Sequence, residues 1–313
     1  MGIPEGTLGS DADADGGEDS VAATGQVIGF ERLGNRLVVG RWHGVSMVSA
    51  LADSPIPTLQ IEGLTKRFGG LRAVGNFDLT VRRGDLAGLI GPNGAGKTTV
   101  FNMISGLYVP SAGDIRFQGI STLGMEPFEV TRLGVGRTFQ NIRLFPNLSV
   151  LDNVRIAYHT HAGYRMVDAI LRTATFTQRE RELTERAQDF LAIFKLDRIQ
   201  NEQASSLPYG EQRRVEIARA LASSPRLLLL DEPAAGMNPA EIVTLMELIH
   251  FIRDRFKLTI LLIEHQMRLV MNICERITVM DFGEVIARGT PKEIQGNAKV
   301  IEAYLGKGAA HAA

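Results

Sequence analysis

The sequence has little of several features that mark specialised classes of protein. Its 313 residues contain one cysteine, Cys274, which excludes an intramolecular disulfide framework and suits a reducing compartment. The formal net charge is −1, so the chain has no basic excess that would attract nucleic acid. No apolar run approaches the ~20 residues that a membrane-spanning helix needs. We therefore expect a cytosolic chain whose membrane role, if it has one, comes through a partner.

The first 57 residues lack an apolar pattern that could build a core. Five acidic side chains between Asp11 and Asp19 stand among glycine, alanine and serine, a composition typical of disorder. The basic and then apolar layout of a signal peptide is missing as well. We expect residues 1–57 to be a disordered extension, with Met47 as the natural start of the protein, and residues 307–313 to be a disordered tail.

From residue 58 onward the apolar residues follow regular periods. Leu59 and Ile61 alternate with polar residues, as do the apolar positions of 77–81 and 115–117, which predicts half-buried antiparallel strands. Three short runs are almost entirely apolar, with polar or charged residues only at their ends, as strands of a buried parallel sheet are. These runs are residues 86–90, 227–231 and 259–264.

The middle of the sequence, at about 141–222, has a helical pattern. Residues 177–180 (TQRE) carry a capping-box signature, so we expect a helix to begin there. Further on, residues 277–288 suggest a β-hairpin around a turn, and residues 300–305 suggest a closing helix. Strands that alternate with helices predict a mostly parallel sheet.

A glycine-rich loop follows the first apolar run. Residues 91–98 read GPNGAGKT, which fits the phosphate-binding P-loop pattern in its required place between a strand and a helix. Glycines let backbone amides curl around phosphates, and the new helix directs its positive end at them. Lys97 can then reach the β- and γ-phosphates, and the Thr98 hydroxyl can ligate Mg²⁺. Taken alone, the motif predicts only that the chain binds a nucleoside triphosphate.

The second apolar run ends in an acidic pair, Asp231 and Glu232. A buried strand can deliver Asp231 to the Mg²⁺ shell through water and place Glu232 to polarise the attacking water as a general base. Together with the P-loop, this pair predicts an α/β fold of the P-loop NTPase type, RecA-like. Its mostly parallel sheet is expected to carry an antiparallel β subdomain and an inserted α-helical subdomain at about 141–222.

Two further segments resemble one family of proteins. Residues 206–221 (SLPYGEQRRVEIARAL) are similar to the signature loop and helix of ATP-binding-cassette (ABC) transporters, and they lie upstream of the acidic pair as that family requires. His265, just past the third apolar run, resembles the family's switch histidine. Gln140, in the segment RTFQ, resembles its γ-phosphate sensor. The resemblance covers residues 59 to about 290 and implies an ATPase domain at 58–306.

The resemblance also implies roles for individual residues. The catalytic residues would be Lys97, Gln140, Glu232 and His265, and Mg²⁺ would be held by Thr98, Gln140 and Asp231. In this family the signature loop completes the ATP site of a facing subunit, so the working unit would be a dimer with two ATP molecules between the subunits. Residues 234–238 would contact that facing subunit. The implied nucleotide-binding residues are Phe68, stacked on adenine, with Gly91, Pro92, Asn93, Gly94, Ala95, Gly96, Lys97, Thr98, Thr99, Leu207, Tyr209, Gly210 and Glu211.

The signature loop departs from the family's usual Leu-Ser-Gly-Gly-Gln. Here residues 207–211 read LPYGE, so Pro208 replaces a serine hydroxyl that would donate to the γ-phosphate of the facing site. The backbone amides near Gly210 and the helix dipole remain as donors. We therefore expect a weaker facing site and asymmetric hydrolysis. Restoring serine at position 208 should then change the hydrolysis rate of the assembled complex.

Finer matches resemble one branch of the family, the ATPases of branched-chain amino-acid importers. They lie at residues 137–154 (RTFQNIRLFPNLSVLDNV), 232–239 (EPAAGMNP) and 303–306 (AYLG). The long stretch between 154 and 196 favours the longer of that system's two ATPase subunits. The implied partners are a second cassette ATPase or a second copy, two membrane permeases, and indirectly an external solute-binding protein. The chain would lie at the cytoplasmic face of the inner membrane, with residues 141–148 near a permease coupling helix.

Other functions fit the sequence less well. A lipopolysaccharide-export ATPase shares the VEIARAL helix but would be expected to keep a serine in its signature loop. Related importers of amides or urea stay open, because this subunit does not bind the solute. A soluble cassette protein acting on ribosomes or DNA usually carries two cassettes or a long coiled-coil insert. A GTPase needs an Asn-Lys-x-Asp motif, and a P-loop kinase would not explain residues 206–221.

Overall fold

The structure is a computed structural model that describes residues 29–33, 36–40, 56–159 and 166–305. The chain divides into two compact units, residues 1–43 and 44–313, which are treated separately. In the first unit, strands β1 (Gly29–Leu33) and β2 (Arg36–Gly40) form an antiparallel hairpin. We expect disorder in 1–57, and at these two segments the structure shows strands instead. The strands themselves contain β-favouring residues, Phe30 in the first and Val38 and Val39 in the second, and Phe30 pairs with Val39.

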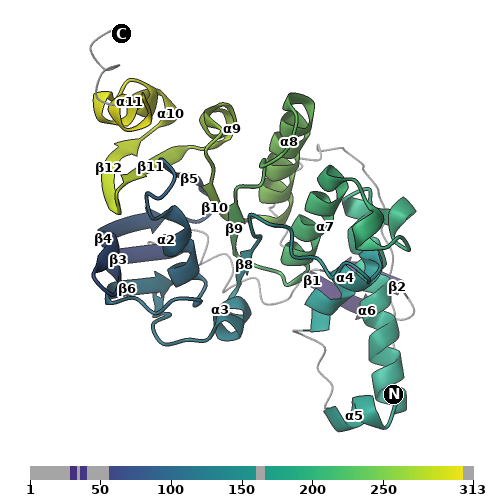
Figure 1. Cartoon of the computed structure of the whole chain (residues 1–313). Coiled ribbons are helices and arrows are strands. Elements are labelled where there is room, and N and C mark those ends of the chain that lie inside the picture. Colours follow the sequence, from purple (N-terminus) through teal and green to yellow (C-terminus); the bar gives the residue numbers. More distant parts are fainter. Residues whose placement is uncertain (1–28, 34–35, 41–55, 160–165, 306–313) are drawn as a thin grey trace, which may run out of the picture. The chain divides into compact units, whose positions relative to one another are not determined.

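The second unit is built on a six-stranded, mostly parallel sheet (Figure 1). The strand order is β12-β11-β5-β10-β9-β8, and only the edge pair β11 and β12 is antiparallel. The three continuous apolar runs form neighbouring inner strands of this sheet, which confirms their prediction as buried parallel strands. The six strands are β5 (Leu86–Ile90), β8 (Val135–Arg137), β9 (Leu227–Asp231), β10 (Thr259–Ile263), β11 (Arg276–Asp281) and β12 (Glu284–Gly289).

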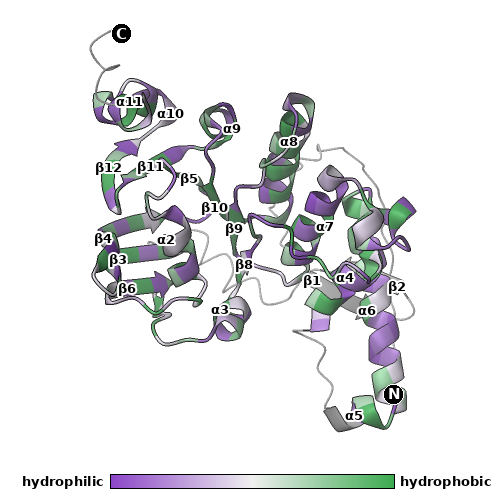
Figure 2. Ribbon diagram, viewed as in Figure 1, coloured by the Kyte–Doolittle hydropathy of each residue, from purple (hydrophilic) through white to green (hydrophobic). Residues whose placement is uncertain are grey.

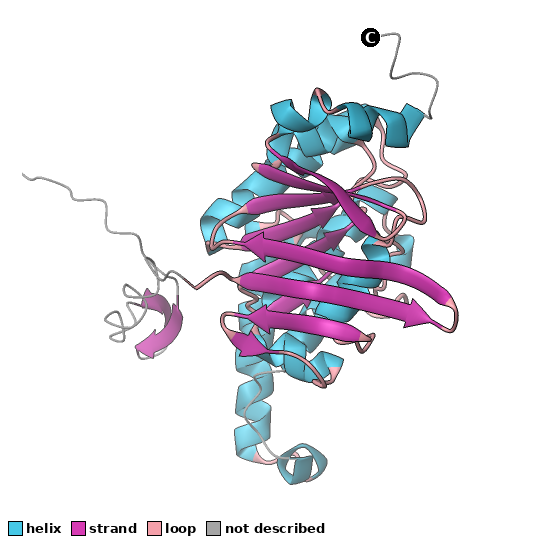
Figure 3. Ribbon diagram, turned by 90° about the vertical axis from the view of Figure 1, so that its left-hand side faces the viewer, coloured by secondary structure: helices cyan, strands magenta, loops and turns pink. Residues whose placement is uncertain are grey.

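A smaller antiparallel sheet with the order β4-β3-β6-β7 forms the second layer, as the alternating pattern predicted. Figure 2 shows this alternation as bands of hydrophobic and hydrophilic residues along β3 and β4. In Figure 3 the antiparallel strands lie in front of the parallel sheet, with helices behind it. The strands of the second layer are β3 (Leu59–Phe68), β4 (Leu71–Val81), β6 (Ala112–Phe117) and β7 (Ile120–Ser121).

The parallel sheet separates two apolar clusters. On β9, Leu228 and Leu230 belong to the cluster with the helices, whereas Leu227 and Leu229 belong to the cluster with the antiparallel sheet. Alternate residues of a strand point to opposite faces, so a strand that is apolar throughout can support both layers. This burial on both faces fixes the carboxyl end of β9, where the acidic pair begins.

Helices connect the strands and cover the parallel sheet. Within the described residues, none of them is both long and apolar enough to cross a bilayer. The helices are α2 (Lys97–Ile104), α3 (Pro127–Leu133), α4 (Val150–Tyr158), α5 (Met166–Ile170), α6 (Ala174–Ile193), α7 (Tyr209–Ala222), α8 (Pro239–Phe256), α9 (Met267–Ile273), α10 (Pro291–Gln295) and α11 (Ala298–Leu305), with short 3-10 turns at Asp197–Ile199 and Ala204–Ser206.

The start of helix α6 corrects one prediction. We expect the helix to begin at the capping-box signature of 177–180, but it begins at Ala174 with Thr173 as its N-cap. The Thr173 hydroxyl accepts a hydrogen bond from the Phe176 amide at 3.3 Å. A side-chain oxygen that reaches the third residue of a helix is what defines an N-cap, and Thr173 has this geometry one turn before Thr177.

Candidate nucleotide-binding site

The P-loop joins β5 to α2 by backbone that suits glycine at two crowded positions. Gly91 has φ +151°, and a Cβ atom there would lie 2.0 Å from the carbonyl oxygen of Met280. Gly96 has φ +98°, and its Cβ would lie 2.6 Å from the carbonyl oxygen of Ala73. Gly96 caps α2 without a side-chain hydrogen bond. The first amides of a helix lack intrahelical partners, so the amides that open α2 can serve a phosphate.

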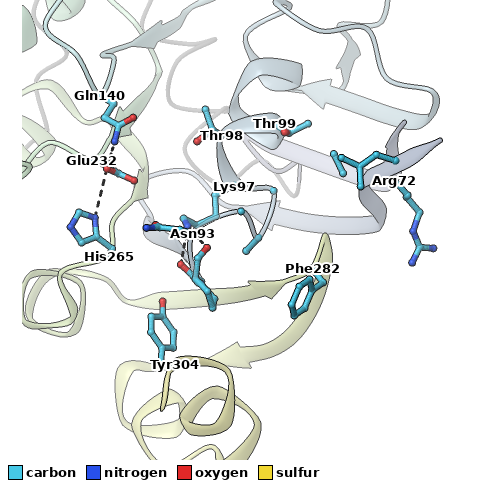
Figure 4. Close-up of a pocket in the computed structure, with 17 residues that line it drawn as sticks. Arg72, Asn93, Lys97, Thr98, Thr99, Gln140, Glu232, His265, Phe282 and Tyr304 are labelled. Carbon is cyan, nitrogen blue, oxygen red and sulfur yellow. Dashed lines mark hydrogen bonds and ion pairs between the residues drawn. The ribbon is translucent and has the colours of Figure 1, made fainter. Parts of the chain in front are cut away.

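Lys97 is the first residue of α2 and lies under the loop. Its ammonium donates to the carbonyl oxygens of Gly91 at 2.8 Å and Pro92 at 2.9 Å (Figure 4). The side chain is buried, and this burial lowers the pKa of Lys97, although Glu232 and Asp231 act in the opposite direction. A buried cation at this place favours an anionic ligand, because added negative charge offsets the cost of burial.

A pocket of about 850 Å³ opens above the P-loop. It brings together four residues that are far apart in the sequence and that were predicted as catalytic: Lys97, Gln140, Glu232 and His265. Figure 4 shows them around one space, with Phe282 and Tyr304 at its other side. The pocket is lined by Leu71, Arg72, Ala73, the P-loop and start of α2 from Gly91 to Thr99, Gln140, Glu232, His265, Phe282 and Tyr304.

Glu232 lies beside two of the other residues that were predicted as catalytic. The Gln140 amide nitrogen donates to a Glu232 carboxylate oxygen at 2.6 Å, and the His265 Nδ1 atom lies 3.7 Å from the same oxygen. The His265 contact is an ion pair when the imidazole is protonated. The Glu232 backbone has φ +44° and donates to the carbonyl of Ile263 at 2.9 Å, so β10 fixes this turn. The carboxylate is thereby directed into the pocket rather than along the strand.

Asp231 has a partner that the sequence did not reveal. Its carboxylate accepts a hydrogen bond from the Arg137 guanidinium at 2.9 Å, and both side chains are buried. Arg137 also donates to Asn102 and Ser105 of the P-loop helix region, at 2.8 and 2.7 Å. Burial raises the pKa of Asp231, while Arg137 lowers it. Asp231 is not among the residues that line the pocket.

The residues predicted to hold Mg²⁺ offer an oxygen donor set that suits it. Thr98 and Gln140 line the pocket, whereas the carboxylate of Asp231 is engaged by Arg137. This arrangement fits an indirect contact of Asp231 with the cation through water. Within the described part of the chain, no cluster of three or more histidine, cysteine, aspartate or glutamate side chains could hold a metal by itself.

Phe68 lies at the end of β3 and is not among the residues that line the pocket. Its ring packs edge-on against Tyr108, with a centroid distance of 5.4 Å, and the Lys66 ammonium lies 5.1 Å from the Phe68 centroid. The ring is 42% exposed. The structure therefore leaves the stacking of Phe68 on adenine a prediction.

The signature-loop residues lie away from this pocket. Leu207 is buried, Pro208 caps α7 without a side-chain hydrogen bond, and Tyr209 is the first residue of the helix. The Tyr209 ring is 42% exposed. Gly210 and Glu211 follow in the first turn of α7. None of these residues lines the pocket formed by the P-loop of the same chain.

Glu264 is a buried residue that no sequence motif marks as part of the site. Its carboxylate accepts hydrogen bonds from the backbone amides of Ala234 at 2.8 Å, His265 at 3.0 Å and Gln266 at 3.2 Å. Burial raises the pKa of Glu264, and these amides act in the opposite direction. The carboxylate thereby ties His265 to the loop after Glu232. Its only signal in the sequence was its place beside His265.

Two aromatic residues from the C-terminal part of the chain also line the pocket. Phe282, in the turn between β11 and β12, is 87% exposed. Tyr304 of α11 directs its hydroxyl toward the P-loop in Figure 4, and burial raises its pKa to about 12. Neither was predicted as a site residue, because nothing in a hairpin turn or a closing helix marks it as close to residue 91.

The fold and the pocket define a P-loop ATPase cassette, and comparison with known proteins narrows this class. The family model described as ABC transporter matches residues 74–235, and a model described as branched-chain amino acid ATP-binding cassette transporter matches residues 284–310. The chain belongs to the ABC transporter family, and it is an ATPase.

Individual relatives cover almost the whole cassette. The high-affinity branched-chain amino acid transport ATP-binding protein BraF of Pseudomonas aeruginosa is 45% identical over 80% of this chain and 98% of its own length. The lipopolysaccharide export system ATP-binding protein LptB of Escherichia coli is 37% identical over the same shares of the two chains. A crystal structure of the ADP conformation of an ATP-binding cassette of an ABC transporter matches with a TM-score of 0.70 at 30% identity, covering 80% of this chain and all of that chain.

Proposed function

We propose that this chain drives the import of branched-chain amino acids, as the ATP-hydrolysing subunit of a membrane transporter. The proposal is supported by similarity to branched-chain amino acid transport proteins, both over the whole cassette and in its C-terminal segment. BraF, which is named for branched-chain amino acid transport, is 45% identical to this chain, whereas LptB, which is named for lipopolysaccharide export, is 37% identical. Residues 284–310, at the end of the cassette, match the model specific to that branch and supply Tyr304 to the nucleotide pocket.

In the proposed reaction each of the residues predicted as catalytic has a task. Lys97 and the amides that open α2 bind the β- and γ-phosphates, because both present positive charge to the same place. Glu232 accepts a proton from the attacking water as general base. Gln140 holds that carboxylate at 2.6 Å, and His265 lies beside it to hydrogen-bond the γ-phosphate. Mg²⁺, held by Thr98 and Gln140 and through water by Asp231, would neutralise charge on the phosphates.

The proposed working unit is a dimer. The signature loop, at 207–211, lies away from the pocket of its own chain, so it is available to a facing cassette. That cassette is a second ATPase subunit or a second copy of this chain. Two permeases and an external solute-binding protein complete the proposed transporter, with this chain at the cytoplasmic face of the membrane. Phe145, 47% exposed within 141–148, is apolar surface suited to a permease helix.

The test is uptake of labelled leucine, isoleucine and valine by cells whose native gene carries Glu232→Gln. The amide keeps the shape of the side chain but cannot act as a base, so ATP binding should survive while uptake falls by at least about 100-fold. The matched control is Glu247→Gln, which makes the same change at an exposed position on α8. Control cells should take up all three amino acids normally.

Two other results would contradict the proposal. Unchanged uptake in the Glu232→Gln cells would show that this chain does not drive branched-chain amino acid import. Transport of amides, urea or lipopolysaccharide would then be tested. Rapid phosphate release by the purified Glu232→Gln complex would remove Glu232 as the general base. Both measurements are made with wild-type rescue, so that loss of expression is separated from loss of chemistry.

A further inference from the structure

A buried ion pair on α7 connects the two loops that the proposed mechanism uses. Arg213 and Glu216 are separated by 2.7 Å and are 0% and 1% exposed at their side chains. They stand one helical turn apart, on the face of α7 that is turned toward the segment after β8. A buried ion pair is costly to desolvate unless further hydrogen bonds satisfy both groups. The partners of this pair therefore indicate what it does.

The partners are backbone groups on both sides of Gln140. Arg213 donates to the carbonyl of Phe139 at 2.7 Å and to the carbonyl of Gln140 at 2.9 Å. Glu216 accepts from the amide of Arg143 at 3.2 Å and from the amide of Phe139 at 3.4 Å. Four hydrogen bonds from one ion pair thus hold residues 139–143, and Gln140 is the residue that contacts Glu232.

The same guanidinium also reaches the signature loop. Arg213 donates to the Tyr209 hydroxyl at 3.1 Å, and its centre lies 5.8 Å from the centroid of the Tyr209 ring. The Tyr209 ring in turn lies beside Gly236, where a Cβ atom would be 3.8 Å from the ring. The planar guanidinium of Arg213 therefore contacts both the segment that contains Gln140 and Tyr209, the first residue of the signature helix.

We propose that Arg213, oriented by Glu216, is a positioning residue that transmits the position of Gln140 to Tyr209. Binding of a γ-phosphate beside Gln140 moves the backbone of 139–143. Because the Arg213 guanidinium is hydrogen-bonded both to this backbone and to Tyr209, the start of α7 moves with it. The signature loop of the chain then adjusts to the state of its own ATP site before it engages the facing one. Tyr209 stands where the family's signature loop usually has glycine, and its hydroxyl accepts the hydrogen bond from Arg213. The inference rests on the proposed binding of ATP beside Gln140, and it rests on the proposed dimer only in its last step.

The first experiment tests, within one chain, whether Arg213 couples the Gln140 segment to the signature loop. Amide hydrogen exchange of the full chain carrying Glu232→Gln, at concentrations where it is monomeric, is measured with and without Mg-ATP. ATP should change exchange in residues 138–143 and in residues 206–212 together. With Arg213→Lys added, the change at 138–143 should remain, and the change at 206–212 should fall at least twofold, because lysine keeps the charge but loses the fork.

The matched control is Arg214→Lys. Arg214 is the next residue of α7, and its guanidinium donates to the Phe194 carbonyl, away from Gln140 and Tyr209. If Arg213→Lys and Arg214→Lys respond to ATP alike, the proposal is wrong. A chain whose residues 206–212 do not respond to ATP would also overturn it. Neither result bears on which solute is transported, so the proposed import function fails or stands separately.

The second experiment measures ATP turnover by the assembled transport complex. Arg213→Lys should lower kcat roughly tenfold, the equivalent of about one charge-assisted hydrogen bond, and leave KM for ATP unchanged because the P-loop is untouched. Tyr209→Phe removes only the hydroxyl of a side chain that is 42% exposed, so it should keep the fold even if the substitution of the buried Arg213 does not. It should lower kcat in the normal chain and have no further effect in Arg213→Lys. Additive effects, or a kcat loss that follows the melting temperature alone, would contradict a positioning role.

Discussion

At the scale of single residues, Lys97 couples nucleotide binding to pH. Burial lowers the pKa of Lys97 from its ordinary value of 10.5. The unfolded chain therefore holds this proton more tightly than the folded chain. The contribution of Lys97 to stability is complete above 10.5 and is lost as the pH falls through the lower, folded pKa. Phosphates placed beside the ammonium act in the opposite direction and raise this pKa.

The first prediction follows from these two opposite effects on the pKa of Lys97, burial and bound phosphate. In the pH range just below 10.5, where part of the Lys97 population is neutral, ATP binding should be accompanied by proton uptake. Isothermal titration calorimetry in two buffers of different ionisation heat measures this uptake directly. Lys97→Arg is the control, because arginine stays protonated throughout that range. Equal uptake by Lys97→Arg would assign the proton to another group.

Individual site residues differ in how far the sequence could identify them. Lys97, Glu232 and His265 stand in motifs whose order along the chain is itself informative, and the structure brings them to one pocket. Arg137 and Arg213 could not be found in this way. Arg137 meets Asp231 across 94 positions of sequence, and Arg213 meets the Phe139 carbonyl across 74. Such contacts depend on how β8, β9 and α7 pack, which no local pattern specifies.

At the scale of elements, periodicity predicted the strands better than capping motifs predicted the ends of helices. Runs of apolar residues predicted β5, β9 and β10 because burial on both faces leaves no other pattern. The start of α6 was misplaced because 173–180 offers more than one threonine able to cap, among them Thr173 and Thr177. The helix extends to the earlier one, Thr173, and Thr177 donates its hydroxyl to the Thr173 carbonyl at 3.2 Å instead.

The second prediction compares these two threonines. Thr173→Ala removes the N-cap and should lower the stability of the helical subdomain by about 1 kcal/mol. Thr177→Ala, inside the first turn, should change stability by no more than about 0.5 kcal/mol, because alanine favours a helix interior. Hydrogen exchange of residues 174–193 measures both variants in the intact chain. A larger loss from Thr177→Ala would place the cap where the sequence motif had suggested.

At the scale of the whole chain, the two matching family models span residues 74–235 and 284–310, and neither reaches residues 1–46. The third prediction is that a chain starting at Met47 binds ATP with unchanged affinity and unfolds at an unchanged temperature. Fluorescence titration with a labelled ATP analogue and thermal unfolding test this directly. Weaker binding would show that residues 1–46 contribute to the cassette. An intact native peptide from residues 2–46 would contradict Met47 as the natural start.

The alternation on β9 places an unusual constraint on the gene. Any large aliphatic residue can stand at 227–230, because both sides of the strand are equally apolar. The number of residues cannot change. Losing one codon would leave the hydropathy profile almost intact, yet it would exchange the sides to which Asp231 and Glu232 point. Natural variation in this strand should therefore be rich in substitutions and free of single-residue insertions and deletions. What must be conserved is the number of residues in β9, rather than the identity of their side chains.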